Sequence, residues 1–468
     1  MRAVATPRQN NARGGAGDCM QHIDITRLVD EGPFGKTRFL VALLCCLAVF
    51  CDGFDTQAIA YIAPALAAEW HVSKSAFGPV FAASLAGLMV GALLFGSLSD
   101  RRGRKIGLIL SVVVFGVFSL LTASVDSVGA LLVMRFLTGL GLGGVMPNAI
   151  ALTSEYAPAR IRSTVVMVMF CGFSLGAALG GVVAASLIGH FGWRSVLIAG
   201  GIAPLLLTPV LMRYLPESLD YMVAKGMARE RIVAALARIA PTVDIDPDDR
   251  FIRHARDAAR SSVAELFSKD RARTTVLFWL IFFMSLLEVY LFSSWLPILL
   301  SESGLSVDRA VTTSSLFQVG GVAGTLLLGR FIDRRWPFAL LSLVYAGASA
   351  AVLLLGLNVH GAFSVMVCAI LAAGFCIVGG QIAANALVAR SYPTAIRATG
   401  VGWAFGVGRI GSIMGPLIGG ALLEMRWDPA HLFMLGCVPA LVSAGAAWAL
   451  HARRVEGNAV TALEQGGA

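Results

Sequence analysis

The sequence predicts an all-α membrane protein with twelve transmembrane helices in two pseudo-symmetric six-helix bundles. Its 468 residues are 57% hydrophobic and only 14% charged, whereas soluble domains have about 25% charged residues. Apolar stretches long enough to cross a bilayer, about 20 residues each, recur from residue 39 to residue 450. Two motifs also recur six helices apart, which indicates a duplicated unit.

Each apolar stretch is expected to be a helix, because lipid offers the backbone no other hydrogen-bond partner. The first stretch is too long for a signal peptide, so we expect it to be retained. The expected helices span residues 37–60, 76–98, 106–125, 128–150, 164–188, 193–213, 273–298, 309–331, 338–357, 361–389, 398–423 and 430–451. The expected units are an N-terminal tail (1–36), a first bundle (37–213), a linker (214–272), a second bundle (273–451) and a C-terminal tail (452–468).

The positions of the 37 Lys and Arg residues predict the orientation. If both tails and the linker are cytoplasmic, the outer loops hold only Lys74, Arg194, Arg309 and Arg426. Basic residues concentrate on the cytoplasmic side of membrane proteins. We therefore expect a multi-pass protein of a bacterial inner membrane, with both termini inside. The net charge of +9 then reflects topology and not nucleic-acid binding.

The motifs that recur are short and specific. Residues 96–102 (GSLSDRR) follow the second helix, and residues 329–335 (GRFIDRR) follow the eighth. Residues 158–164 (PARIRST) precede the fifth helix, and residues 393–399 (PTAIRAT) precede the eleventh. Such repeats typically enclose a binding site near the middle of the membrane.

Residues 96–105 (GSLSDRRGRK) resemble the signature loop of the major facilitator superfamily, and residues 135–141 (RFLTGLG) resemble its fourth-helix motif. Residues 155–162 and 216–218 are similar to segments of its sugar and organic-ion porters. Residues 52–56 (DGFDT), 141–148 and 402–412 resemble a narrower group, the aromatic acid:proton symporter family.

This resemblance implies the major facilitator fold and a secondary active transporter. Such a protein imports a small carboxylate, aromatic or derived from an aromatic compound, together with protons by alternating access. The implied partners are the carboxylate, protons and the bilayer, and the implied state is a monomer. Neither a metal nor a cofactor is expected, and no nucleophile–base set or phosphate-binding loop indicates an enzyme.

Two alternatives remain open from the sequence. One is a proton-coupled exporter, although exporters of this superfamily often carry a Gly-Pro motif in the fifth helix and residues 172–181 contain no proline. The other is a membrane receptor that senses aromatic acids without transporting them. A binding assay with no accompanying flux would favour the receptor.

Charged residues within the apolar stretches are the main site candidates, because each costs several kcal/mol in a bilayer, about 2.5–3.5 on insertion scales. Asp52 and Asp55 lie three residues apart, on one helix face. Their mutual repulsion and a dry site both favour the protonated form. We expect them to carry the coupled proton; a structural pair with a neighbouring Arg is the alternative.

Arg135 and Arg409 are the candidate substrate ligands. The resemblance places the fourth helix beside the central cavity, so Arg135 either clamps the carboxylate bidentately or pairs with one of the aspartates. Arg409 lies among glycines that permit close helix approach. It meets the substrate anion, or it ties two helices together.

Further candidates are polar or aromatic. Glu288 is either a second protonatable group or a hydrogen-bonded structural acid. Gln381 and Asn385, one turn apart, are expected to bind substrate oxygens or to pair helices. Six aromatic side chains are candidates for stacking on the aromatic ring of a substrate. These are Phe54, Tyr61, Phe81, Tyr290, Trp295 and Trp403.

Charged residues at the cytoplasmic helix ends are expected to control the conformation and not to bind substrate. We expect the two repeated motifs to latch the halves together in one state and to release them in the other. The residues concerned are Asp100, Arg101, Arg104, Asp333 and Arg334, with Glu155 and Arg162 joining the network.

Overall fold

The computed structural model describes residues 22–24, 28–30, 32, 34–239, 250–252, 263–268, 271–331, 336–393 and 396–466. Within these residues, twelve helical segments are long and apolar enough to cross a membrane. The expected fold class is therefore confirmed. Asp333 and Arg334 lie outside the described residues.

Six helices form the first bundle. They are α2 (Lys36–Trp70), α3 (Phe77–Arg102), α4 (Arg104–Thr122), α5 (Val128–Tyr156), α6 (Arg162–Phe191) and α7 (Arg194–Tyr214). A short 3-10 turn, η1 (Lys74–Ala76), precedes α3. Gly103 separates α3 from α4 with φ 106°, a conformation that favours glycine, and a Cβ there would lie 2.3 Å from the Glu217 carboxylate.

The second bundle repeats this order. Its helices are α10 (Ala272–Glu302), α11 (Val307–Phe331), α12 (Pro337–Leu357), α13 (Phe363–Ser391), α14 (Arg397–Glu424), α15 (Pro429–Leu435) and α16 (Cys437–Gly466). The last expected span is thus divided into α15 and α16 near Gly436. The break follows from Pro439, which lacks the N–H that a continuous helix would use.

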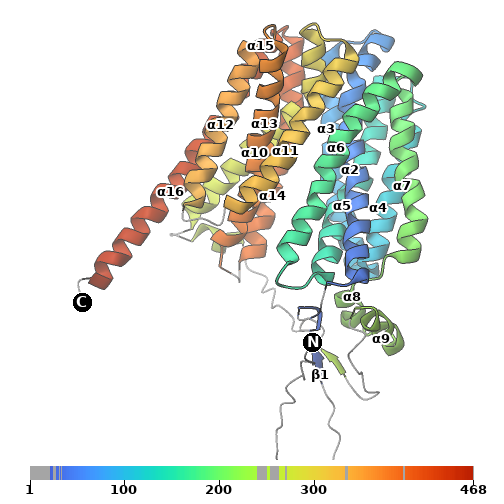
Figure 1. The fold of residues 1–468 in the computed structure, drawn as a ribbon, viewed down its shortest axis with the longest axis vertical. Coiled ribbons are helices and arrows are strands. Elements are labelled where there is room, and N and C mark those ends of the chain that lie inside the picture. Colours follow the sequence, from blue (N-terminus) through green and yellow to red (C-terminus); the bar gives the residue numbers. More distant parts are fainter. Residues whose placement is uncertain are drawn as a thin grey trace, which may run out of the picture.

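Short elements lie at one end of the bundles. They are α8 (Leu219–Ala224), α9 (Arg229–Ala237), η2 (Val263–Phe267) and a parallel pair of strands, β1 (His22–Asp24) and β2 (Arg250–Ile252). These two strands were not predicted from the sequence. Figure 1 shows α8, α9 and β1 below the bundles. We call this the linker end and the opposite one the far end.

Hydrophobic packing differs between the two ends. At the far end one buried core contains residues of both bundles, including Ile59 and Leu66 of α2 and Trp295 and Leu299 of α10. At the linker end each bundle has its own core. The bundles are therefore packed against each other at the far end and have separate cores at the linker end.

Candidate functional site

The middle of α2 carries both aspartates of the predicted site, and both are fully buried. Gly53 lets α2 approach α6 closely, because a Cβ at this position would lie 2.0 Å from the carbonyl oxygen of Phe173. The helix periodicity then turns Asp52 and Asp55 to neighbouring positions on α2. Their local surroundings are nevertheless different.

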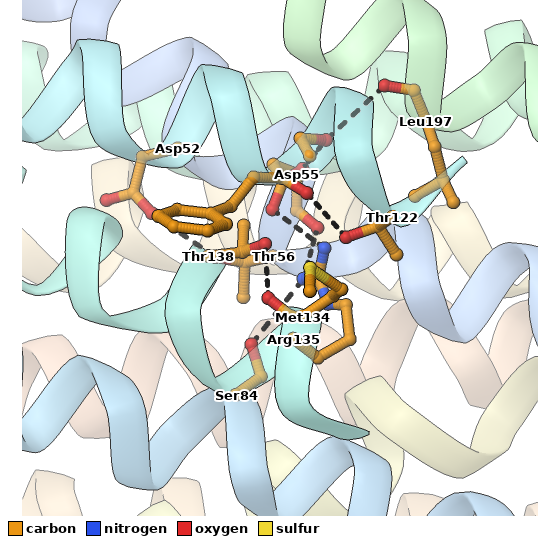
Figure 2. Close-up of polar contacts among 11 residues, drawn as sticks. Asp52, Asp55, Thr56, Ser84, Thr122, Met134, Arg135, Thr138 and Leu197 are labelled. Atoms are coloured by element: carbon orange, nitrogen blue, oxygen red, sulfur yellow. Dashed lines mark hydrogen bonds and ion pairs between the residues drawn. The ribbon is translucent and has the colours of Figure 1, made fainter. Parts of the chain in front are cut away.

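Asp55 forms an ion pair inside the first bundle (Figure 2). Arg135 Nη1 lies 3.1 Å from Asp55 Oδ2, and both side chains are 0% exposed. The N–H direction lies off the line to that oxygen, so this contact is not an aligned hydrogen bond. Arg135 Nη2 instead donates to the backbone carbonyl of Asp55 at 3.1 Å and to the Ser84 hydroxyl at 3.5 Å.

Ser119 of α4 completes this cluster. Its hydroxyl donates to Asp55 Oδ1 at 2.5 Å and lies 3.3 Å from the carbonyl oxygen of Leu197. The ion pair and this hydroxyl tie α2, α4 and α5 together. Arg135 is thus engaged by Asp55, the second of the two arrangements that the sequence allowed, and sequence reasoning did not identify Ser119.

Asp52 has different surroundings from Asp55. Its Oδ1 accepts a hydrogen bond from Thr56 at 3.2 Å. Arg409 of α14 lies within electrostatic range of Asp52. Arg409 is partly buried, and its Nη1 donates a long hydrogen bond, 3.4 Å, to the Tyr290 hydroxyl. Asp52, Arg409 and Tyr290 therefore place an acid, a cation and a phenol from α2, α14 and α10 at the boundary between the bundles.

The glycines around Arg409 bring α14 against α10, as their spacing predicted. A Cβ on Gly411 would lie 2.2 Å from the carbonyl oxygen of Phe283, and one on Gly408 would lie 2.6 Å from Leu286. A Cβ on Gly406, in contrast, would meet no described atom of another helix within 4 Å. This packing fixes the height at which Arg409 meets Tyr290.

Gln381 and Asn385 of α13 bond to each other, with Gln381 Nε2 donating to Asn385 Oδ1 at 2.9 Å. Gln381 Oε1 is buried and accepts no hydrogen bond from the residues that the structure describes. An unpaired buried acceptor costs about 1–3 kcal/mol. This oxygen is therefore available to a donor group from outside the described part of the chain.

Glu288 is buried in the middle of α10, and within the described part of the chain neither of its carboxyl oxygens has a hydrogen-bond partner. Ser285, one turn away, accepts a hydrogen bond from the Tyr345 hydroxyl of α12 at 2.9 Å. Glu288 thus lies toward the interior of the second bundle and separately from the Asp52–Arg409 group.

The predicted aromatic ligands are dispersed. Phe54 packs against Gly180 and Gly200, between α6 and α7. Trp403 is 45% exposed and stacks on Trp279 at 5.7 Å. Tyr290 is the aromatic candidate that contacts Arg409.

The far end is closed above this site by polar and aromatic contacts between the bundles. Gln57 Nε2 of α2 donates to the backbone carbonyl of Ser293 of α10 at 3.0 Å, and within the second bundle Gln318 donates to the Ser293 hydroxyl at 3.3 Å. Phe81 and Trp295 meet edge to face at 5.3 Å. Tyr61, also a predicted aromatic ligand, donates to a backbone carbonyl within the first bundle.

The predicted control residues take partners at the linker end. Asp100 pairs with Arg104 at 2.9 Å, and the Arg101 backbone carbonyl accepts from Tyr221. Glu155 accepts from Ser218.

Arg162 pairs with Asp30 of the N-terminal segment. Arg38 anchors that segment by donating to the carbonyl oxygens of Val29 and Gly32. Asp30 gave no signal in the sequence, because its partner is distant along the chain.

Comparison with known proteins identifies the family. A sequence profile described as Major Facilitator Superfamily matches residues 45–416. The 4-hydroxybenzoate transporter PcaK of Pseudomonas putida is 42% identical over 435 residues, which cover 93% of this chain and 96% of that protein. The gallate transporter of Pseudomonas putida is 42% identical over 443 residues, covering 94% and 98%. The 3-(3-hydroxy-phenyl)propionate transporter of Escherichia coli is 37% identical over 424 residues, covering 90% and 96%.

Solved structures agree on the fold. A D-xylose-proton symporter superposes with a TM-score of 0.69 at 19% identity, covering 88% of this chain and 98% of that chain. A bacterial homolog of the human lysosomal transporter Spinster gives a TM-score of 0.67 at 16% identity, covering 90% and 98%. The chain therefore belongs to the major facilitator superfamily, among its aromatic acid transporters.

Proposed function

We propose that this protein imports an aromatic carboxylate together with protons by alternating access. The observation that carries the proposal is the placement of Asp52 and Arg409, an acid and a cation on opposite bundles. The curated relatives named above, transporters of 4-hydroxybenzoate, gallate and a hydroxyphenylpropionate, support an aromatic acid as cargo.

Competition for Arg409 provides the coupling. A substrate carboxylate that binds the Arg409 guanidinium takes the counter-charge that stabilises ionised Asp52. In a poorly hydrated site, two carboxylates near one cation favour protonation of one of them. Substrate binding therefore favours proton uptake by Asp52, and proton uptake favours substrate binding. One proton with one monoanion moves no net charge.

Asp55 and Arg135 serve this cycle from within the first bundle. Their ion pair holds α2 against α5 and so sets the direction in which Asp52 points. Protonation of Asp55 would release Arg135, which makes the pair a second point at which a proton can act. Substrate contact by Arg135 requires that release.

A hydroxylated ring suits the free acceptor on α13. Gln381 Oε1 is buried without a donor, and a phenolic O–H supplies one. Sites that leave a polar group unpaired discriminate strongly against ligands lacking the matching group. We propose that Gln381 and Asn385 select hydroxybenzoates over benzoate, with Tyr290 beside the carboxylate.

The orientation follows from the basic linker. We propose that the linker end and both termini are cytoplasmic, in a bacterial inner membrane, and that the protein acts as a monomer within the lipid. The closed far end is then the outer side, so the structure represents the inward-facing state. Asp100, Arg104, Glu155 and Arg162 change partners when the linker end closes. Asp333 and Arg334, which lie outside the described residues, are assigned to the same network by the repeated motif.

Uptake of radiolabelled 4-hydroxybenzoate into proteoliposomes with an imposed pH gradient tests the proposal. The wild-type protein should accumulate the substrate when the exterior is acidic, and collapsing the gradient should stop accumulation. Asp52→Asn should retain exchange of substrate down its own gradient but lose accumulation driven by pH. Accumulation that survives in Asp52→Asn contradicts the role of Asp52.

A further inference from the structure

Glu288 is a buried acid that the transport cycle above does not use. It is 0% exposed, and both carboxyl oxygens lack hydrogen-bond partners among the described residues. Among the described residues, the titratable groups found within electrostatic range of Glu288 include Tyr345 of α12, Cys376 of α13 and Cys437 of α16, all ordinarily neutral at pH 7. Arg409 of α14 reaches α10 at Tyr290, on a different face of the helix from Glu288.

The repeat relates Glu288 to Asp55. Pro64 and Pro297, each inside the first helix of its bundle, are the same number of residues apart as Gly87 and Gly320. The same separation takes Asp55 to Glu288. The packing agrees with this alignment: a Cβ on Gly87 would lie 2.1 Å from the Phe136 carbonyl, and one on Gly320 would lie 2.2 Å from the Leu371 carbonyl.

The cation of the first bundle has no counterpart in the second. One sequence separation takes Gly139 to Gly374, and Phe136 to Leu371, in the paired helices α5 and α13. It takes Arg135 to Ile370, which is fully buried. The first repeat thus buries an acid with an arginine, whereas the second buries an acid at the matching place with an isoleucine.

A carboxylate without a cation or a hydrogen bond cannot remain ionised in such a place, because burial of an isolated charge is far more costly than protonation. The surroundings are also sealed. One turn along α10, Phe292 stacks on Phe317 at 6.2 Å and on Phe433 at 6.1 Å. Phe292 and Phe317 belong to the core that the two bundles share at the far end.

We infer that Glu288 is a protonation site distinct from Asp52, and that the far end closes only when Glu288 carries a proton. A proton takes the place that the arginine holds in the first repeat. Ionised Glu288 requires water, so it favours a state in which the core around Phe292 is open. This inference rests on the proposed alternating access, and it adds a second proton to the closing step.

The number of protons linked to closure tests the inference. Spin labels on genetically encoded reactive residues at exposed Ser124 and His360, one in each bundle at the far end, report the open and closed populations. Each linked proton changes their ratio by up to tenfold per pH unit. Between about pH 5 and 9, which spans the documented range for buried carboxyls, the wild type should open as the pH rises.

The slope of the open-to-closed ratio against pH gives the number of protons linked to closure. Glu288→Gln keeps the shape of the protonated acid, so it should lower this number by one and leave the far end closed at high pH. Ile370→Arg supplies the missing cation and should remove one proton as well. Ser285→Ala, one turn away on α10, should keep the wild-type slope. The inference is overturned if the slope is unchanged in both Glu288→Gln and Ile370→Arg. It is also overturned if the open-to-closed ratio of the wild type does not change with pH.

These outcomes are separate from those of the proposed function. Accumulation driven by a pH gradient, with an unchanged slope in Glu288→Gln, leaves the symporter intact and removes Glu288 from the proton cycle. The transport proposal itself is tested with 4-hydroxybenzoate and with the carboxylate that most raises the melting temperature of the protein. It is contradicted if the wild type accumulates neither of them.

Discussion

At the residue scale, the ion pair between Asp55 and Arg135 contributes little net stability, but the loss of either partner is costly. Both side chains are 0% exposed, so the attraction between them is offset largely by the loss of hydration. Removing one partner leaves the other charged, buried and alone. The pair therefore holds α2 against α5 as long as Asp55 is not protonated.

This constraint predicts an asymmetry between single and double variants. Asp55→Asn leaves Arg135 without a counter-charge and should lower the free energy of unfolding by about 3–5 kcal/mol. Asp55→Asn combined with Arg135→Gln should be more stable than Asp55→Asn alone, because no lone charge remains. Thermal melting of the purified variants measures both. Additive losses would mean that the two side chains do not interact.

Arg409 should be sensitive to the shape of its replacement and not only to its charge. Lysine keeps the charge but cannot form the two parallel hydrogen bonds that a guanidinium makes with a carboxylate. A charged hydrogen bond contributes about 1.5–3 kcal/mol, so Arg409→Lys should raise the dissociation constant for 4-hydroxybenzoate by about 10-fold to 100-fold. Isothermal titration measures it.

The control for this measurement is Arg309→Lys, an exposed arginine in α11 near the far end. Its substitution should leave the affinity unchanged. An affinity equally insensitive to Arg409→Lys would assign Arg409 to helix packing, the alternative that the sequence left open.

The sequence could identify Asp52, Asp55, Arg135 and Glu288 because a charge in an apolar stretch is costly and therefore conspicuous. It could not identify Ser119 as a partner of an aspartate, since serine is common in membrane helices and carries no comparable cost. Partners from distant segments depend on the fold, and a sequence pattern does not contain them.

At the element scale, glycines set how closely the helices of each bundle approach. In the pair α3 and α5, a Cβ on Gly87 would lie 2.1 Å from a carbonyl oxygen of α5, and one on Gly139 would lie 2.0 Å from one of α3. Small residues on both sides allow such contact in membrane helices. The same arrangement in α11 and α13 makes the two bundles alike.

Gly87→Ala should therefore destabilise the protein although alanine is the better helix former. The gain in helix propensity is about 1 kcal/mol, whereas forcing α3 away from α5 costs typically about 1–3 kcal/mol or more. The melting temperature should fall. Gly445→Ala in α16, where nothing lies within 4 Å, should keep or raise it. Equal effects at the two positions would rule out packing as the cause.

Helix boundaries were predicted less well than helix positions. The first helix was expected to end at residue 60, yet α2 continues through Pro64 to Trp70. Proline is tolerated within membrane helices because neighbouring helices and local adjustments satisfy the freed backbone groups. The sequence contains the proline but not the neighbours, so it indicates a helix end where none occurs.

At the scale of the whole molecule, the state of the protein depends on where the two bundles share a core. The shared core contains parts of both bundles at the far end only, and the Lys74–Glu302 ion pair also joins them there. That ion pair is partly exposed, so it contributes little, about 0–1 kcal/mol. Apolar contact and the Gln57–Ser293 hydrogen bond therefore dominate closure.

A wedge at this interface should trap the open state. Gly181 of α6 faces α11, where a Cβ would lie 2.4 Å from Ser315 Cβ. Gly181→Phe cannot be accommodated there without separating the bundles, so the far end should stay open. Binding of 4-hydroxybenzoate should persist while uptake into proteoliposomes is lost, because only closure carries the substrate to the other side.

Val183→Phe provides the matched comparison, because Val183 lies two residues along α6 and is 42% exposed. It places the same phenylalanine side chain at an exposed position on another face of α6 and should leave uptake unchanged. Uptake that survives Gly181→Phe would show that contact between α6 and α11 is not required for transport. Loss of binding together with uptake would point to damage within the first bundle, because α6 also packs against α2, the helix that carries Asp52 and Asp55.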